Sequence, residues 1–345
     1  MPSIVNVVCY SYKGGSGRST AAVNIAFAIA REGKKVACLD LDVGAPGLHM
    51  IMKNWDEHCA ALVESNDGVV GIQDFLNHDG PGEPDIHCLE KCMFDVGAVQ
   101  PATIAKEENR GNLIFLFSST RQRTLTDLTG RRVDVERFIA KYRILQEALA
   151  DRLGALSARD EIYIIVDAPN GITPVSLPLL RNADLILIFY RHSLQHVLGT
   201  IETAEKIRHY MAAEMERRYV RILLVGSCVP EDLIASLAAQ KERLPQWSRA
   251  EDEMDKRFRE INSQLETFGK IHFPSVRRLT GAIIEDDVLK ILEQPLTGDG
   301  IHRSLFDADA PLNEMISTKT KAKIAMIADE VIQFGDEVRV KKGGR

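Results

Sequence analysis

One run near the N-terminus has the residue types and spacing of a phosphate-binding loop. Residues 13–20 read KGGSGRST, between a mostly apolar run at residues 4–10 and a helix-forming segment at residues 21–30. Glycines allow consecutive backbone N–H groups to converge on one anion, and the N-terminus of a helix adds partial positive charge. A cation beside the last glycine and a hydroxyl group for magnesium complete such a loop. The order strand, glycine-rich turn, helix therefore predicts a site for a phosphate group.

Carboxylates follow two further apolar runs. Asp40 and Asp42 close the run at residues 36–42, and Asp167 closes a second run four residues before Gly171. The carboxyl ends of parallel strands lie at one edge of a sheet, so these groups are expected beside the phosphate loop. A carboxylate there can hold the water shell of magnesium, and a glycine N–H can contact a γ-phosphate. Solvated acids at strand ends are the alternative interpretation, which the adjacent loop disfavours.

Two positions separate this loop from the ordinary pattern GxxxxGK[ST]. Tyr12 stands at the first glycine position, and Arg18 replaces the loop lysine, while a different lysine, Lys13, opens the loop. In these features the run resembles the deviant-P-loop ATPases of the ParA/MinD family, whose signature is KGGxGK[ST]. The arginine form resembles a bacterial KGGxGR subgroup. The runs DLDVGAPGL, residues 40–48, and DAPNG, residues 167–171, are similar to the further motifs of this family.

The resemblance implies a catalytic role for three charged residues. Lys13 would reach across a dimer to the nucleotide of the partner subunit, Arg18 would contact the β- and γ-phosphates, and Asp42 would position the attacking water. An arginine offers a fork of donors that can bridge phosphate oxygens, but it is bulkier than lysine and always charged. Because phosphoryl transfer depends on positioning and charge neutralisation, Arg18 is expected to keep nucleotide binding and to slow hydrolysis.

The resemblance also implies ATP and Mg²⁺ as cofactors. Ser19 would be a magnesium ligand, Asp40 and Asp167 would support the metal's water shell, and Thr20 would contact the α-phosphate. The family often contacts the adenine base through an Asn-Arg pair after the strand at residues 220–226; this pair is missing here, so the base follows from the resemblance alone. Further nucleotide contacts would come from the loop, from the γ-phosphate glycine and from the segment beside the base, namely Gly14, Gly15, Ser16, Gly17, Arg18, Ser19, Gly171, Ser227, Val229 and Pro230.

The composition is that of an ordinary globular protein. Hydrophobic residues make up 45% of the 345 residues and charged residues 27%. No apolar segment is long enough to span a bilayer, and the first strand lacks the basic region of a secretion signal. The net charge of −6 argues against a protein that coats nucleic acid through bulk charge. Cys9 and Cys38 lie in apolar runs, which favours buried thiols in a reducing cytoplasm.

Apolar runs and helical segments alternate along the chain, which predicts a mostly parallel central sheet flanked by helices on both faces. With the resemblance, this is the Rossmann-like α/β fold of a deviant P-loop NTPase. A single domain over residues 1–334 is expected, with residues 50–111 as an insertion or partner-binding segment and residues 335–345 as a basic, mobile tail. Strands are expected at residues 4–10, 36–42, 112–117, 162–167, 183–190, 220–226 and 270–274, and helices at residues 21–30, 71–76, 134–153, 197–210 and 312–334.

Two smaller features complete the sequence predictions. His87, Cys88 and Cys92 form a metal-like grouping within the insertion, but one Cys-x₃-Cys without a second pair favours buried or surface thiols over zinc. The turn expected at residues 275–278 would line the base pocket. The tail at residues 335–345 lacks the bulky apolar face of a membrane-docking helix, so stable membrane insertion is not expected.

Together with the resemblance, these features predict a nucleotide-dependent switch in the cytoplasm. ATP would close a homodimer whose composite surface contacts a protein partner, and hydrolysis would reset it. One alternative is a weakly hydrolysing, nucleotide-bound scaffold or regulatory subunit of a bacterial signalling or defence system, which Arg18 favours. A second alternative is a DNA-associated partition ATPase, which the acidic net charge disfavours. The sequence leaves the partner and the hydrolysis rate open.

Overall fold

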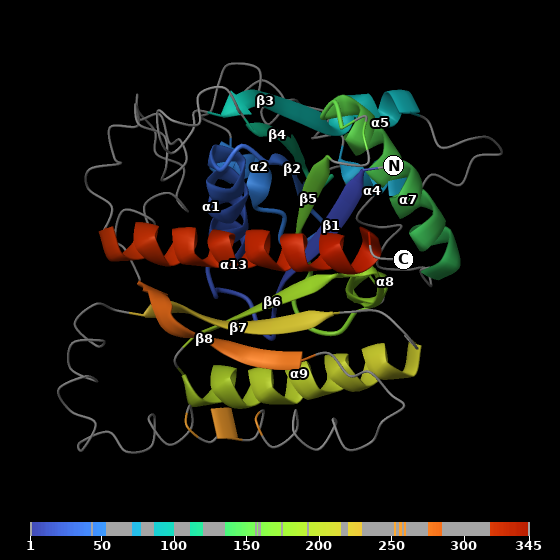
Figure 1. Cartoon of the computed structure of the whole chain (residues 1–345). Helices are drawn as coiled ribbons and strands as arrows, with labels where there is room; N and C mark the ends of the chain where they lie inside the picture. The colour runs from blue at the N-terminus through green and yellow to red at the C-terminus, as the bar shows by residue number, and fades with distance from the viewer. Residues whose placement is uncertain are drawn as a thin grey trace.

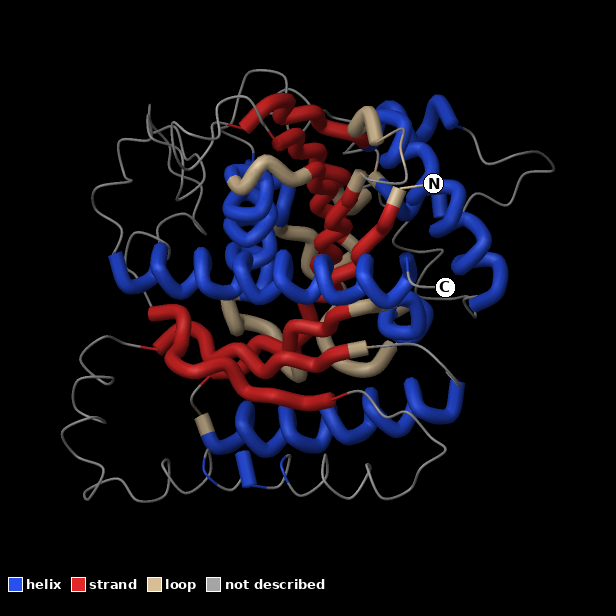
Figure 2. Tube along the Cα trace, viewed as in Figure 1, coloured by secondary structure: helices blue, strands red, loops and turns tan. Residues whose placement is uncertain are grey.

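The structure, a computed structural model, is built around one large sheet with helices on its two faces (Figures 1 and 2). In Figure 1 the helix nearest the C-terminus, α13, crosses in front of this sheet. The described residues are 2–42, 44–52, 71–76, 86–99, 111–119, 135–155, 157, 160–173, 175–191, 193–214, 220–229, 252, 255–256, 259, 275–284 and 318–343.

Within this part of the chain, eight strands form the sheet in the order β3-β4-β2-β5-β1-β6-β7-β8. Neighbouring strands are parallel, except that the edge strand β3 is antiparallel to β4. The prediction of a mostly parallel sheet is therefore confirmed. The strands are β1 (Ser3–Ser11), β2 (Lys35–Asp40), β3 (Met93–Val99), β4 (Gly111–Leu116), β5 (Glu161–Asp167), β6 (Leu185–Arg191), β7 (Arg221–Val229) and β8 (Ser275–Ile284).

The helices form two layers that bury the two faces of the sheet. The layer of the first helix consists of α1 (Arg18–Arg31), α2 (Leu48–Met52) and α13 (Thr318–Gly343). The opposite layer consists of α4 (Ile72–Leu76), α5 (Ile86–Cys92), α7 (Val135–Arg152), α8 (Ser176–Asn182) and α9 (Leu194–Glu214).

The first strand lies between two hydrophobic cores. Val7 and Cys9 belong to the core beneath α1 and α13, while Val8 and Tyr10 belong to the core beneath α7, α8 and α9. Successive side chains of a strand point to opposite faces, so a strand covered on both sides is apolar at nearly every position. The mostly apolar run at residues 4–10 of β1, in which Asn6 is the polar residue, is the consequence of this double burial.

The parallel register brings the aspartate ends of the strands to one edge. Cys9 of β1 pairs with Asp167 of β5, and Asp167 in turn pairs with Asp40 of β2. β1 lies between β5 and β6, so the loop that leaves its carboxyl end at Ser11 starts beside these carboxylates. The predicted meeting of the phosphate loop with the strand-end acids is therefore present.

The edge strand β3 is a feature that the sequence pattern does not reveal. It lies inside the segment expected to be an insertion, residues 50–111, together with α4 and α5. Its register against β4 shifts between Asp95 and Gly97, and Gly97 has a φ of +75°. An irregularity of this kind interrupts the alternation of inward and outward side chains. The strand consequently has no clear period of two in its sequence.

The C-terminal helix is longer than the sequence predicts. The expected end is Phe334, followed by a mobile tail at residues 335–345, but α13 continues well beyond that position. Val338 lies one helical turn after Phe334 and is buried in the same core, and Arg339 Nε lies 3.6 Å from Glu161 Oε1. The prediction of a mobile tail is thus wrong for the described part of this segment, because its apolar and basic residues have partners on the sheet.

Other sequence predictions fall partly outside the described residues. The strand expected at residues 270–274 lies outside them, and the turn expected at residues 275–278 is instead the start of β8, because its backbone pairs with β7. His87 and Cys88 lie in α5, but their side chains are not described. The described side chains include no group of three or more His, Cys, Asp or Glu that could hold a metal ion. None of the described helices combines the length and apolar character needed to cross a membrane.

Candidate functional site

The loop between β1 and α1 forms an open backbone cradle. Gly15 and Gly17 have φ angles of +77° and +66°, a left-handed conformation that residues with a Cβ rarely adopt. A Cβ at Gly15 would meet no heavy atom within 4 Å, so there is space beside the loop. Gly17 precedes α1, and its carbonyl accepts a helical hydrogen bond from Ala21 N at 2.9 Å. The loop therefore places the N-terminus of α1 where it can bind an anion.

A serine from β7 supports this loop. Ser227 is buried, and its hydroxyl donates to the carbonyl oxygen of Ser16 at 2.7 Å and lies 3.2 Å from that of Tyr190. The family resemblance places Ser227 beside the adenine base, whereas the structure places its hydroxyl on the backbone of the phosphate loop. Val229 is the last residue of β7, and Pro230 lies outside the described residues.

The tightest approach to the loop is at Gly17, where a Cβ would lie 2.9 Å from Cys228 Sγ. The left-handed backbone alone costs a residue with a Cβ about 1–2 kcal/mol. We therefore expect Gly17→Ala to lower the free energy of unfolding by more than this strain. Gly154→Ala is the matched control, because Gly154 has a φ of +63° with no heavy atom within 4 Å of its Cβ position. Urea denaturation measures the free energy of unfolding of both variants. Equal decreases for the two would mean that the Cys228 side chain moves aside without an energetic cost.

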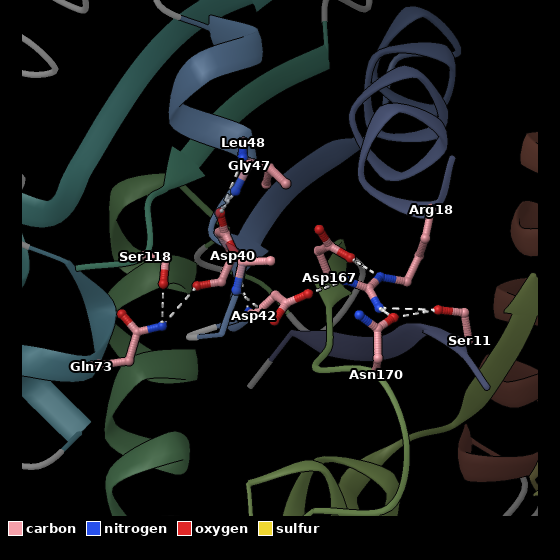
Figure 3. Close-up of polar contacts among 11 residues, drawn as sticks. Ser11, Arg18, Asp40, Asp42, Gly47, Leu48, Gln73, Ser118, Asp167 and Asn170 are labelled. Atoms are coloured by element: carbon pink, nitrogen blue, oxygen red, sulfur yellow. Dashed lines mark hydrogen bonds and ion pairs between the residues drawn. The ribbon is translucent and has the colours of Figure 1, made fainter. Parts of the chain in front are cut away.

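Arg18 extends from the first turn of α1 toward the carboxyl ends of β2 and β5 (Figure 3). Its Nη2 donates to Asp42 Oδ2 at 2.6 Å, and its Nε donates to Asp167 Oδ1. Arg18 is 5% exposed, Asp42 4% and Asp167 0%. The structure therefore brings these three predicted site residues together, with the guanidinium as counter-ion of the two carboxylates.

Ser11 and Asn170 complete the contacts of Arg18, and the sequence reasoning missed both. Arg18 Nη1 lies 2.6 Å from Asn170 Oδ1 and 3.2 Å from Ser11 Oγ. The Ser11 hydroxyl also donates to Asn170 Oδ1, at 2.6 Å. Ser11 is the last residue of β1, and Asn170 follows β5 in the DAPNG run. The available signal was their position: both are polar residues at the carboxyl end of an apolar strand, like the aspartates.

Burial and charge act in opposite directions on this cluster. Burial lowers the pKa of the Arg18 guanidinium, but Asp167 and Asp42 raise it by more, so the net shift is upward. Burial raises the pKa of Asp167, and Arg18 and Ser19 lower it without cancelling that effect. Buried charges are stable only when they are paired and hydrogen-bonded. The two carboxylates and the guanidinium therefore depend on one another.

Asp40 anchors the loop that follows β2 (Figure 3). Its Oδ2 accepts hydrogen bonds from the backbone N–H groups of Gly47 and Leu48, both at 3.0 Å, and its Oδ1 accepts one from Asp42 N at 3.1 Å. Burial and the charge of Asp167 raise the pKa of Asp40 to about 8, against the opposing effect of these backbone hydrogen bonds. The structure thus gives Asp40 a role in holding this loop, and its role in a magnesium shell stays a prediction.

The oxygen atoms near α1 fit the expected magnesium ion. Asp167 Oδ2 is buried and has no hydrogen-bond partner among the described residues, and the Ser19 hydroxyl lies beside this carboxyl and lowers its pKa. The loop after β2 approaches the same place, because a Cβ on Gly47 would lie 3.7 Å from Ser19 Oγ. Mg²⁺ prefers hard oxygen ligands, uses one or two carboxylates and keeps water and phosphate in the rest of its shell. Ser19 and Asp167 supply donors of this kind.

Lys13 lies at the surface, directed toward α9. Its side chain is exposed, and its Nζ lies 3.5 Å from Gln195 Oε1. The preceding residue, Tyr12, packs on α9 at Gly199, where a Cβ would lie 2.3 Å from the tyrosine ring. Because only a glycine leaves room for this ring, the contact fixes the direction in which the chain enters the loop. Lys13 is thereby held at the rim of the site.

The remaining predicted residues also lie around the loop. Gly171 has a φ of +70° and donates its N–H to the carbonyl oxygen of Ser11 at 3.2 Å. A Cβ on Gly14 would lie 3.5 Å from Asn170 Nδ2, which places the loop beside the segment after β5. Thr20 lies in the first turn of α1, where its carbonyl accepts a hydrogen bond from an asparagine one turn later.

The fold and the site together define a class of protein. A mostly parallel sheet carries an open glycine-rich loop between β1 and α1, and aspartates stand at the ends of β2 and β5. A serine and a threonine follow the loop cation in the first turn of the helix. This is the phosphate-binding architecture of a P-loop NTPase.

Comparisons of the sequence with known proteins indicate one type within this class. Residues 3–70 match the ParA family model, described as NUBPL iron-transfer P-loop NTPase. The chain is 24% identical over 212 residues to the septum site-determining protein MinD of Escherichia coli K12, and the match covers 61% of this chain and 60% of that protein. The chain thus matches less than two thirds of the length of this curated relative.

Solved structures share the fold along almost the whole chain. The pNOB8 ParA bound to nonspecific DNA has a TM-score of 0.59 at 15% identity, covering 98% of this chain and 99% of that one. A chain of the MinC:MinD cell division protein complex of Aquifex aeolicus has a TM-score of 0.55 at 17% identity, covering 95% of this chain and 96% of that one. MinD of Pyrococcus horikoshii complexed with Mg-ADP has a TM-score of 0.51 at 14% identity, covering 96% of each chain. The chain therefore has the fold of the ParA and MinD structures, and its residues 3–70 match the ParA family model.

Proposed function

We propose that this protein is a dimeric switch that binds Mg·ATP, hydrolyses it slowly and acts on a protein partner in the cytoplasm. The observation that carries the proposal is the open glycine loop beside buried Arg18, Asp42 and Asp167 at one edge of the sheet. The MinD relative complexed with Mg-ADP supports the choice of nucleotide and metal.

The residues of the chain divide the chemistry between them. Backbone N–H groups of the loop bind phosphate oxygens, and Thr20 contacts the α-phosphate. Ser19 and Asp167 would hold Mg²⁺, and the bound ion would neutralise charge on the phosphates. Asp42 would orient the attacking water, and Gly171 would sense a γ-phosphate through its backbone N–H, which donates to the carbonyl oxygen of Ser11 in this structure.

One observation favours a second candidate, a scaffold that binds nucleotide and barely hydrolyses it. The loop cation, Arg18, is bound to Asp42, the residue proposed to orient the water. While this ion pair persists, neither side chain can do its part in phosphoryl transfer. Steady-state ATPase rates at saturating Mg·ATP separate the two candidates. A rate equal to background, together with tight nucleotide binding, selects the scaffold.

Lys13→Ala tests the proposed dimer. A lysine that contacts the partner's nucleotide adds a charge-assisted contact across the interface, worth about 1.5–3 kcal/mol. We expect the wild type to double its mass with a non-hydrolysable ATP analogue and Mg²⁺, and Lys13→Ala to need at least about tenfold more protein to do so. Light scattering with ATP analogue, ADP and no nucleotide measures the mass.

Lys206→Ala is the matched control for this experiment. Lys206 is an exposed lysine of α9 that pairs with Glu202 one turn away at 2.6 Å, so its loss removes a surface charge only. The control is expected to dimerise like the wild type. Dimerisation that is unaffected by the loss of Lys13 would show that the cross-subunit role is wrong.

A DNA-associated role remains the other alternative. One structural relative is a ParA bound to nonspecific DNA, but the net charge of −6 disfavours bulk electrostatic binding by this chain. Binding through phosphate contacts weakens steeply with salt. Retention on nonspecific DNA that requires ATP and disappears at high salt would support this alternative over the protein-partner switch.

A further inference from the structure

The contacts of Arg18 use most of its hydrogen-bonding capacity. A guanidinium has five N–H groups in a fixed planar fork. Nε donates one to Asp167, Nη1 donates to Asn170 and Ser11, and Nη2 donates one to Asp42, which together use four. A triphosphate on the loop would need the same donors. The carboxylate contacts and the proposed phosphate contacts of Arg18 are therefore alternatives.

Ser11 and Asn170, which we call the guanidinium seat, explain why the cation is an arginine. The seat binds Nη1 while Asp42 binds the other end of the fork at Nη2. A lysine ammonium is a compact charge without a planar fork, so it cannot reach the seat and both carboxylates with fixed geometry. The Ser11 hydroxyl donates to Asn170 Oδ1, which holds the amide oxygen in place for the arginine.

We propose that Ser11 and Asn170 are positioning residues that hold Arg18 on Asp42 and Asp167, and so compete with the phosphates of a bound nucleotide for this side chain. The proposal rests on the proposed function, because it concerns the same nucleotide site. The seat sets the free-energy cost of moving Arg18 from the carboxylates to the phosphates. Weakening the seat lowers this cost, so a variant lacking it binds nucleotide more tightly.

The test measures the affinity for a fluorescent, non-hydrolysable ATP analogue in the presence of Mg²⁺. Asn170→Ala removes the 2.6 Å hydrogen bond to Arg18 Nη1. A hydrogen bond to a charged group is worth enough to change an equilibrium by about tenfold or more. We expect Asn170→Ala to bind the analogue about tenfold more tightly than the wild type, and Ser11→Ala, whose contact is longer at 3.2 Å, to shift in the same direction by less.

A second pair of variants separates positioning from a general structural effect. In an Arg18→Lys background the fork is absent, so adding Asn170→Ala is expected to leave the affinity unchanged. A merely structural role of Asn170 would alter affinity equally in both backgrounds. Asn182→Ala is the matched control, because Asn182 is also a half-buried amide, but it donates to the carbonyl oxygen of Pro178 within α8. Its affinity should equal that of the wild type.

Each outcome bears on a different claim. Tighter binding of Asn170→Ala only when Arg18 is present supports the seat. Unchanged or weaker binding of Asn170→Ala and Ser11→Ala, with a wild type that binds the analogue, overturns the seat and leaves the proposed function intact. Absence of Mg·nucleotide binding in the wild type and in every variant overturns the proposed function itself. If Asn170→Ala fails to fold, Ser11→Ala alone decides the question.

Discussion

Arg18→Ala is expected to lower the free energy of unfolding by about 3–5 kcal/mol, far more than the loss of an ordinary surface arginine. The reason is burial: the substitution leaves Asp42 and Asp167, which are 4% and 0% exposed, without their counter-ion. Removing one member of a buried ion pair leaves a charge that neither water nor a partner stabilises. Equilibrium urea unfolding of the purified chain without nucleotide measures the effect.

Arg181→Ala provides the matched control for this experiment. Its ion pair with Glu136 spans 3.0 Å, but the Glu136 side chain is 79% exposed, so its loss should cost at most about 1 kcal/mol. Similar losses for the two arginine variants would show that the Arg18 cluster contributes no more than a surface pair.

The decrease in the free energy of unfolding caused by Arg18→Ala should also depend on pH. Burial raises the pKa of Asp167, and in this variant the guanidinium no longer opposes that shift. A carboxyl whose pKa is higher in the folded than in the unfolded state destabilises the fold increasingly as the pH rises. The difference in the free energy of unfolding between Arg18→Ala and the wild type is therefore expected to be larger at about pH 8 than at about pH 5. A difference that grows as the pH falls would contradict this account.

Asp42→Asn is expected to reduce the rate of ATP hydrolysis by about 100-fold or more without weakening Mg·nucleotide binding. Asparagine has nearly the same shape as aspartate. In the wild type, Arg18 Nη2 donates to the Asp42 carboxylate at 2.6 Å, and the asparagine amide oxygen can still accept this hydrogen bond. What is lost is the negative charge that would orient and polarise the attacking water. Single-turnover hydrolysis together with analogue affinity separates the chemical step from binding.

Asp160→Asn is a suitable control, because Asp160 precedes β5 at the opposite end of the strand from Asp167. Its carboxylate accepts a hydrogen bond from Ser157 N and another from Lys35 Nζ, so its removal tests the effect of one lost charge far from the loop. The control should hydrolyse ATP at the wild-type rate. If Asp42→Asn did so as well, Asp42 would have no part in the reaction.

The sequence predicted much of the fold because its strong signals come from double burial. The central strands of the parallel sheet are apolar on both faces at most positions, so their places along the chain are visible as mostly apolar runs. The phosphate loop and the strand-end aspartates were equally visible, since glycine spacing and isolated acids at the ends of apolar runs are local features. The irregular edge strand β3 and the last turns of α13 were missed, because a register shift and contacts with distant residues decide them.

What the sequence alone determined is the set of reactive groups: a glycine cradle, a loop arginine and carboxylates that β-strand register brings to one edge. What only the tertiary structure decided is the partner of each group. Arg18 is bound to Asp42, Asp167, Ser11 and Asn170, and the Ser227 hydroxyl donates to the backbone of the loop. A pattern along the chain fixes the strand end at which a side chain stands, whereas the direction of a long side chain depends on charges and hydrogen-bond partners from other elements. For this reason the cation could be read from the sequence, and its counter-ions could not.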